Sequence, residues 1–159
     1  MKCPQCGKAL DPAKHSDLVC DGEVWCDGCR GYDWELLRPR DFQELRAWSD
    51  LICQACGRAP VPLAADPDPA KFRTEASVVT AEADHGQKTI VLYPPGCRLT
   101  TLCHELAHLL TGEDHTPRWA ATFAQLVAWV KARLEEDSGP PGWPARLPIH
   151  PGPPFTVKR

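Results

Sequence analysis

One stretch of the 159-residue chain constrains its fold more than any other: residues 101–112, which read Thr-Leu-Cys-His-Glu-Leu-Ala-His-Leu-Leu-Thr-Gly. In a helix, positions i and i+4 lie on one face about one turn apart, so His104 and His108 can both reach one zinc ion. Glu105 then stands beside the first ligand, where it can accept the proton of the water that such an ion activates. The pattern predicts a helix that carries two metal ligands and a general base.

The leucines of this stretch predict which side of the helix is buried. At about 100° per residue they gather on one side, while His104 and His108 fall roughly opposite. The side that should face a core consists of Leu102, Leu106, Leu109 and Leu110. The competing interpretation is an ordinary amphipathic helix whose two histidines are solvated or hydrogen-bonded in the core.

A catalytic zinc site needs a third protein ligand, and His115 is the candidate that follows the helix. Gly112 is suited to end the helix in a left-handed conformation, and Thr116-Pro117 is typical of the cap and first residue of another helix. His115 lies in the turn between them, which can fold it back over the histidine face. Glu113 or Asp114 could take its place as the ligand.

Charge and hydropathy argue against some classes of partner. The formal net charge is −3 and Lys and Arg are scattered, so nucleic-acid binding is not supported, although a small basic patch would still permit it. No apolar run approaches the roughly 18 residues of a membrane span, and the start Met1-Lys2-Cys3-Pro4 does not resemble a signal peptide. We therefore expect a cytoplasmic protein without a membrane partner.

Nine cysteines in a reducing compartment indicate metal ligands and free thiols rather than disulfides. Cys3-Pro4-Gln5-Cys6-Gly7 has the sequence of a zinc knuckle, and Cys26-Asp27-Gly28-Cys29 follows at the spacing of a zinc ribbon. A short hairpin over residues 17–25 would join them. A redox role is less favoured because no strand-helix setting surrounds the pairs. We predict one structural zinc ion bound by Cys3, Cys6, Cys26 and Cys29, with Cys20 able to replace one ligand.

A third pair, Cys53/Cys56, ends a helix that is predicted to begin at Asp41. Asp41 and Glu44 resemble a capping box, and the apolar residues after them recur at helical spacing. The pair has no obvious mate. It is either a reduced pair or half of a second zinc site that is completed by two of Cys20, His85, Cys97 and Cys103.

The rest of the chain supplies a hairpin, a second long helix and two proline-rich segments. Residues 58–70 are predicted as a loop, 76–83 and 88–93 as strands joined by a turn at 84–86, and 117–134 as an amphipathic helix. The hairpin would cover the leucine side of the His-Glu helix. The segment 138–159 is expected to be extended and flexible, with a ligand for a proline-recognising partner as the less favoured alternative.

The motif His104-Glu105-Leu106-Ala107-His108, followed by His115-Thr116-Pro117-Arg118-Trp119, resembles the small zincin metallopeptidases, most closely the minimal and SprT-like kinds. In those proteins the third ligand opens a His-Gly-Pro-x-Phe segment that leads into a helix. The resemblance covers about residues 41–137 and implies His104, His108 and His115 as zinc ligands, with Glu105 as the catalytic base. It also implies that an edge strand binds a peptide substrate by strand addition.

The chain departs from these families in three respects. Thr116 and Trp119 replace Gly and Phe of the family segment, but Thr is a good helix cap and Trp still packs. Gly112 lies one position later than the glycine of the metzincin motif, so we reject the metzincin class for this chain. The predicted ribbon precedes the catalytic domain, whereas SprT-like proteases generally carry it afterwards, so the resemblance gives little support to a DNA-linked role.

Together these features predict an α+β fold in three parts. A zinc ribbon occupies 1–37, and a proline-rich tail occupies 138–159. Between them, 38–137 form a zincin-like domain with a helix, a short antiparallel sheet, the His-Glu helix and a second core helix. The predicted function is a zinc metallopeptidase or amide hydrolase with one catalytic and at least one structural Zn²⁺, acting on a protein or peptide substrate.

Some roles remain open at this stage. Tyr93, His85 and Arg118 are candidates for stabilising an oxyanion, and the sequence does not rank them. A binding or adaptor protein would use the histidines as a structural metal site, for example with Asp114 as a fourth ligand. A regulatory protease would cleave a single protein target that the ribbon selects.

Overall fold

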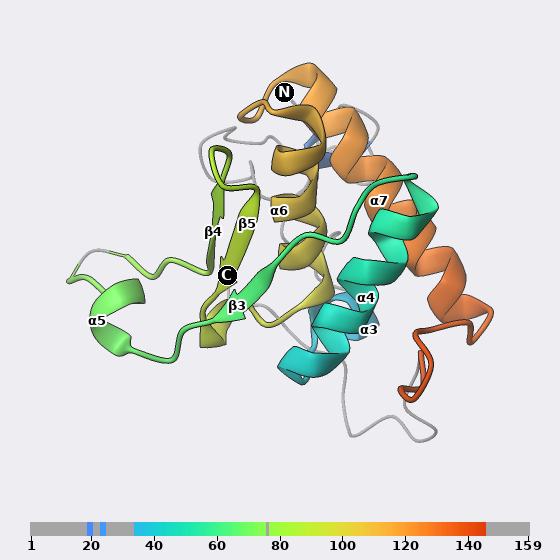
Figure 1. Ribbon diagram of the computed structural model, residues 1–159, viewed down its shortest axis with the longest axis horizontal. Helices are drawn as coiled ribbons and strands as arrows, with labels where there is room; N and C mark the ends of the chain where they lie inside the picture. The colour runs from blue at the N-terminus through green and yellow to red at the C-terminus, as the bar shows by residue number, and fades with distance from the viewer. Residues whose placement is uncertain (1–18, 21–22, 25–33, 76, 146–159) are drawn as a thin grey trace.

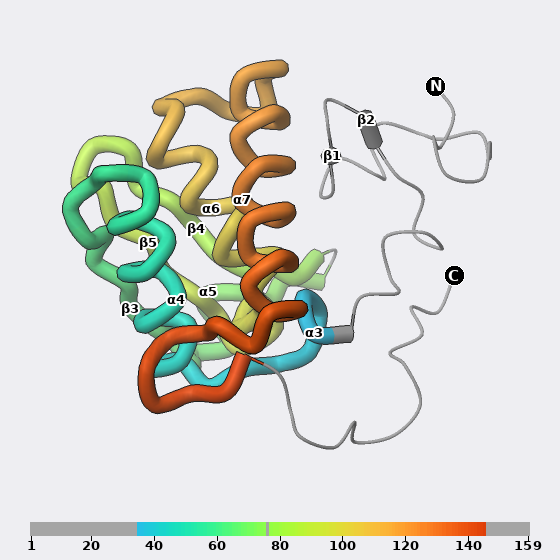
Figure 2. The backbone as a smooth tube through the Cα atoms, turned by 90° about the vertical axis from the view of Figure 1, so that its right-hand side faces the viewer, coloured from blue at the N-terminus to red at the C-terminus, as the bar shows by residue number. Residues whose placement is uncertain are grey.

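The computed structural model describes residues 19–20, 23–24, 34–75 and 77–145. It is an α+β structure in which α6 (Leu99–Thr111) lies between a three-stranded sheet and α7 (Pro117–Glu135), as Figures 1 and 2 show. The helix α4 (Phe42–Ala55) also packs against α6. Shorter elements are α3 (Trp34–Leu37), α5 (Pro69–Phe72) and the 3-10 helix η1 (Pro94–Gly96). No helix within these ranges is long and apolar enough to cross a membrane.

The sheet has the order β3-β5-β4, formed by Leu63–Ala65, Thr89–Leu92 and Ala81–Asp84. The β4–β5 pair is the predicted antiparallel hairpin. β3 runs parallel to β5, with Leu63 opposite Ile90, so the sheet is mixed and the prediction of a purely antiparallel sheet is wrong. Prolines are tolerated here because β3 is an edge strand, and the Pro62 carbonyl accepts a hydrogen bond from the Ile90 N–H.

Two local features differ from the predicted loop and strand boundaries. The segment predicted as a loop over 58–70 contains β3 and the start of α5, which is capped by the Asp68 carboxylate. The strand predicted over 76–83 is present only from Ala81 to Asp84. Before it, the Ser77 N–H donates to Thr74 Oγ1 at 3.0 Å, and side-chain hydrogen bonds of this kind compete with strand pairing.

The helix α4 begins at the predicted cap, but the glutamate of its capping box has another partner. The Asp41 carboxylate accepts hydrogen bonds from the first turn of the helix. Glu44 forms a buried ion pair with Arg40 and accepts a hydrogen bond from the Trp48 indole N–H at 3.3 Å. Arg40 also lies 3.0 Å from the Glu35 carboxylate of α3. The two carboxylates thus compensate the charge of the Arg40 guanidinium, which has no exposed surface. The same ion pairs join α3 to α4.

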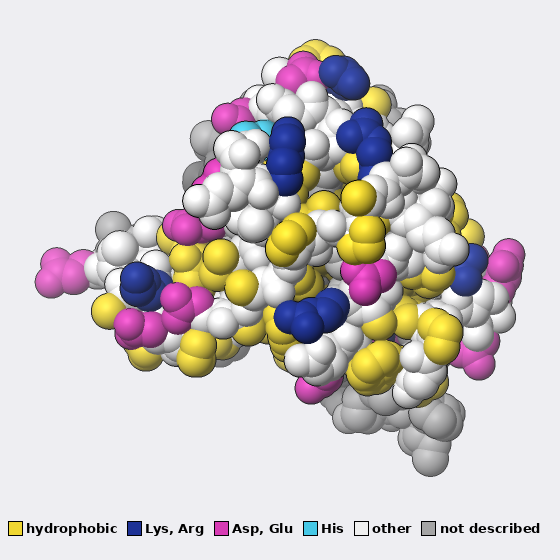
Figure 3. Space-filling view, viewed as in Figure 1, with side chains coloured by type: hydrophobic (Ala, Val, Ile, Leu, Met, Phe, Trp, Pro, Cys, Tyr) yellow, Lys and Arg dark blue, Asp and Glu magenta, His cyan; other side chains and the backbone are white. Residues whose placement is uncertain are grey.

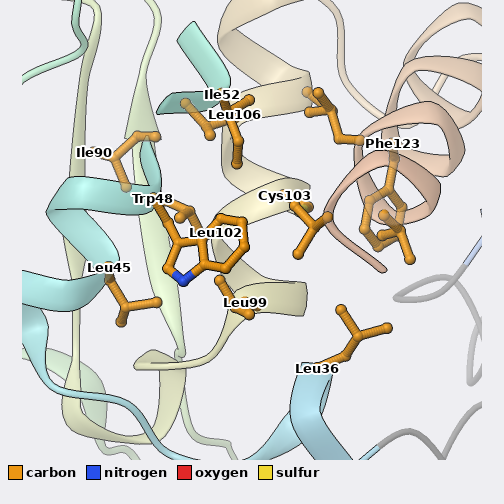
Figure 4. Close-up of a cluster of buried hydrophobic side chains, with 14 of the residues drawn as sticks. Leu36, Leu45, Trp48, Ile52, Ile90, Leu99, Leu102, Cys103, Leu106 and Phe123 are labelled. Atoms are coloured by element: carbon orange, nitrogen blue, oxygen red, sulfur yellow. The ribbon is translucent and has the colours of Figure 1, made fainter. Parts of the chain in front are cut away.

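The leucine side of α6 lies in one hydrophobic core to which all the main elements contribute (Figure 4). Leu102 and Leu106 are fully buried, as the periodicity predicts. They pack in a cluster with side chains from α4, the sheet and α7, among them Trp48, Ile90 and Phe123. Burying one such leucine contributes about 1.5–3 kcal/mol. This burial fixes the rotation of α6 about its axis and holds the histidines on the opposite side.

The core extends beyond both ends of the predicted 38–137 domain. Leu36 in α3 and Ala145, eight positions into the predicted tail, are buried members of the core cluster. The strands β1 (Val19–Cys20) and β2 (Glu23–Val24) form an antiparallel pair where the ribbon hairpin is predicted. Residues 146–159 and the predicted ribbon ligands lie outside the described residues; those ligands are Cys3, Cys6, Cys26 and Cys29. The ribbon and its zinc ion therefore stay predictions.

A close backbone contact requires glycine at position 96. A Cβ atom there would lie 1.9 Å from the Thr80 carbonyl oxygen, just before β4. We expect Gly96→Ala to force β4 away from the start of α6 and to lower the free energy of unfolding by roughly 2–3 kcal/mol, measured by urea denaturation. Gly86→Ala in the hairpin turn is the matched control, because its Cβ would meet the flexible Asp84 side chain at 3.3 Å. Equal stability of the two variants would contradict this prediction.

Candidate metal centre

The connection between α6 and α7 turns His115 back toward the histidines of α6. Gly112 ends α6 in the left-handed conformation with φ 71°, as predicted. Thr116 caps α7, since its hydroxyl accepts a hydrogen bond from the Trp119 N–H at 3.2 Å. His115 has φ 46°, which is uncommon for a residue with a side chain. Two left-handed residues in one short loop reverse the chain tightly enough to return it to the helix that it has just left.

The structure brings the three predicted histidine ligands together. Nε2 of His104 lies 3.2 Å from Nε2 of His108 and 3.3 Å from Nε2 of His115. One ligand atom from each residue lies within 4.8 Å of the others. Nitrogens that bind a tetrahedral zinc ion at about 2.1 Å are separated by about 3.4 Å. The donor set and its spacing therefore fit one zinc ion.

Hydrogen bonding orients the His108 imidazole, and burial favours the neutral form of His104 and His108. Nδ1 of His108 lies 2.9 Å from the Glu113 carbonyl oxygen, to which it donates, so Nε2 offers its lone pair to the group. Burial, together with the neighbouring His108 and His115, lowers the pKa of His104 to about 3. Burial likewise lowers the pKa of His108. The neutral imidazole is the form that binds a metal ion.

The Trp119 ring contacts all three histidines. It stacks on His108 with 5.1 Å between centroids and contacts His104 and His115 edge-on at 4.8 and 4.5 Å. Its indole N–H donates to the His104 carbonyl oxygen at 3.3 Å. The sequence pattern assigned Trp119 to the core and missed this role. The only signal for it is its position in the first turn of α7, just after His115.

Glu105 carries an almost fully buried carboxylate next to the first ligand, with 7% of the residue exposed. Within the described part of the chain, its carboxylate has no hydrogen-bond partner. Burial, and then the negative charges of Glu82 and Asp114, raise the pKa of Glu105 to about 7. A carboxyl group with a pKa near neutrality can accept a proton and later give it up.

A second group of candidate ligands shares His108 but uses its other nitrogen. Asp114 Oδ1 lies 3.4 Å from His108 Nδ1 and 3.4 Å from His85 Nε2. Asp114 belongs to the α6–α7 loop and His85 to the β4–β5 turn. At the end of the molecule where these two segments lie, Figure 3 shows a small histidine surface beside acidic side chains. Asp114 therefore groups with Nδ1, not with the three Nε2 atoms. This position does not support Asp114 as an alternative to His115.

The remaining candidates from the sequence have other partners. The Glu113 carboxylate forms an ion pair with Arg118 at 3.1 Å. Glu113, an alternative metal ligand, and Arg118, an oxyanion candidate, therefore have each other as partners. The Tyr93 hydroxyl donates to the Glu82 carboxylate at 3.0 Å. Of the three oxyanion candidates, His85 is the one whose ring contacts a ring of the histidine group.

The cysteines that the structure describes form no comparable group. Cys53 is buried and Cys56 exposed at the end of α4, and no cluster of three candidate ligands among the described residues includes either. Burial raises the pKa of the Cys53 thiol, and it raises the pKa of Cys103 to about 12. Closure of a second zinc site by His85, Cys97 or Cys103 is thus not supported, and the Cys20 side chain lies outside the described part.

Comparison with family models, with curated proteins and with solved structures finds no significant match. The function of the site must therefore be argued from its geometry and chemistry alone.

The first prediction for this site concerns metal content. His115→Ala should remove one metal ion per chain, because two imidazoles bind zinc more than about 100-fold more weakly than three with a preformed geometry. Zinc content after gel filtration, measured by mass spectrometry, tests this. Gln125→Ala, at an exposed position of α7, is the control and should keep the wild-type content. Unchanged zinc in His115→Ala would remove His115 from the ligand set.

Proposed function

We propose that the protein is a zinc-dependent hydrolase that cleaves peptide or other amide bonds. The observation that carries the proposal is the convergence of three Nε2 atoms, from His104, His108 and His115, together with the buried carboxylate of Glu105, which follows His104 on α6. Two of these ligands and the carboxylate belong to one rigid helix, so their relative positions change little with loop motion.

The number of ligands favours a catalytic site over a structural one. Structural zinc sites are closed by four protein ligands, whereas catalytic sites use three and leave a position for water or substrate. Among the described residues, the group around the three Nε2 atoms has no fourth member. Asp114, the example of a fourth ligand that the sequence offers, lies on the opposite nitrogen of His108. The adaptor hypothesis would be favoured by a fourth ligand, and the part of the chain that the structure describes supplies none.

The residues of the chain have distinct roles in this proposal. The three imidazoles would hold the ion, which when bound supplies an acidified water molecule and polarises the scissile carbonyl. Glu105 takes the proton from the attacking water and delivers it to the leaving amine, and its pKa near 7 suits both transfers. Trp119 keeps the imidazoles in place and excludes water from their rear.

The position of β4 supports an extended peptide as substrate. In the order β3-β5-β4 this strand forms the edge of the sheet, and it lies beside α6. The free backbone groups of an edge strand can pair with a peptide in extended conformation. A peptide that is bound there would run past the helix that carries Glu105.

Glu105→Gln tests the mechanism because it keeps the shape of the side chain but removes the proton acceptor. We expect hydrolysis to fall by about 100-fold to 10 000-fold while zinc content stays at the wild-type level. The measurement is a mass-spectrometric screen for cleavage of peptide mixtures and unfolded proteins. Glu135→Gln at the end of α7 removes the same charge and should cleave like wild type. Comparable hydrolysis by Glu105→Gln and wild type would refute the assignment.

A further inference from the structure

The Nδ1 side of His108 contacts two side chains that have no part in the proposed reaction. Asp114 Oδ1 lies 3.4 Å from Nδ1 of His108 and 3.4 Å from Nε2 of His85. The rings of His85 and His108 are 6.1 Å apart and almost perpendicular, at 81°. A chain of polar contacts thus runs from the β4–β5 turn, through the α6–α7 loop, to a candidate metal ligand on α6.

The hydrogen bonding of His85 indicates that it holds Asp114 in place. Nδ1 of His85 is buried and has no hydrogen-bond partner in the described part of the chain. A buried N–H without a partner costs about 1–3 kcal/mol, so the proton belongs on Nε2, which faces Asp114. The Asp114 side chain is 81% exposed, and an exposed carboxylate has many rotamers to choose from. The donor on His85 favours the rotamer that faces His108.

The carboxylate in turn acts on His108. Its Nδ1–H already donates to the Glu113 carbonyl oxygen at 2.9 Å, so Asp114 at 3.4 Å contributes chiefly negative charge. Negative charge at this N–H makes the opposite nitrogen a stronger donor to a metal ion and restricts rotation of the ring.

We propose that Asp114 and His85 are positioning residues that strengthen metal binding by His108, so that the β4–β5 turn helps to set the zinc affinity. The inference rests on the zinc site of the proposed function but not on its hydrolytic activity. Asp114 acts directly on His108, whereas His85 acts through Asp114. The edge strand that would receive a peptide, β4, ends at Asp84, next to His85, and so leads directly into this contact.

A second metal ion bound by His85, His108 and Asp114 is the competing interpretation, since their ligand atoms also lie within 4.8 Å of one another. Nδ1 of His108 cannot bind an ion while it donates a proton to the Glu113 carbonyl. Two protein ligands would then remain, fewer than the three or four of established zinc sites. The positioning role needs no change in the protonation of His108.

The test compares the zinc affinity of four full-length variants with that of the wild type by competition with a chromophoric chelator. Asp114→Asn, which removes charge but not size, should weaken the histidine site about 10-fold to 100-fold. His85→Ala should weaken it less, and the double variant should bind like Asp114→Asn, because His85 acts through Asp114. Asp84→Asn is the matched control, since this carboxylate in the same hairpin accepts a hydrogen bond from Gln87 and should leave the affinity unchanged.

A spectroscopic readout separates the positioning role from general destabilisation. Cobalt(II) gives ligand-field bands at a histidine site and at a cysteine site, and the cysteine site adds thiolate charge-transfer bands, so the histidine signal is taken as the difference from the spectrum of His104→Ala. We expect Asp114→Asn, but not Asp84→Asn, to alter these bands at unchanged melting temperature. His104→Ala defines the signal that belongs to the histidine site.

Three outcomes would overturn the inference: unchanged zinc affinity in Asp114→Asn, an equal loss in Asp84→Asn, or fully additive losses in the double variant. A further weak zinc equivalent that wild type binds and both His85→Ala and Asp114→Asn lose would replace it with the second ion. None of these measurements uses a substrate. An inactive wild type with these affinity changes would therefore refute the hydrolase and leave the positioning role supported.

Discussion

The burial of one side of α6 is the constraint on which the metal centre depends. Leu102 and Leu106 are fully enclosed by α4, the sheet and α7, and this enclosure fixes the helix against rotation. A rotation by one residue, about 100°, would turn the histidine face toward the apolar core and move the leucines out of their packed positions. The loss of several buried leucines, at about 1.5–3 kcal/mol each, opposes any such rotation. The packing of these leucines thus orients His104 and His108 from the opposite side of the helix.

The α6–α7 loop adds a second constraint, which links two ligands to one another. Its left-handed residues bring His115 back to α6, and its Glu113 carbonyl accepts the Nδ1–H of His108. Any change in the loop that moves His115 also changes the hydrogen bond that orients His108. The third ligand and the tautomer of the second are therefore set by the same few backbone dihedral angles, and the loop behaves as one unit of the site.

The parts of the fold that the sequence predicts well are those with local signals. The i, i+4 histidines, the Gly112 terminus and the Thr116-Pro117 cap depend on neighbouring residues only, and the structure has each of them. β3 was missed because three residues between prolines carry no periodic pattern, and the strand exists through its pairing with β5. The α+β class followed from the helices and the hairpin, whereas the mixed sheet depended on this one non-local pairing.

The same distinction applies within the site. The grouping of the three histidines could be predicted from their spacing. The contacts of Trp119 with them and the side of His108 that Asp114 faces depend on how α7 and its preceding loop pack. Asp114 was a candidate ligand in the sequence, where its position next to His115 was the only information. In three dimensions an adjacent residue can point to the other edge of the same imidazole, which changes its chemistry from ligand to electrostatic support.

Enclosure of His104 and His108 also disfavours a proton on either ring. Burial disfavours the imidazolium form, and the pKa of about 3 for His104 means that protons do not compete for its nitrogen near neutral pH. A proton is held by one nitrogen and would place a charge beside the other two imidazoles, whereas a zinc ion would be shared by three nitrogens at once. The desolvation that penalises the proton is thus offset for the metal ion by its larger number of ligands. The Trp119 ring, which contacts all three imidazoles, contributes to this enclosure and thereby favours the neutral form of His104 and His108 that a metal ion can bind.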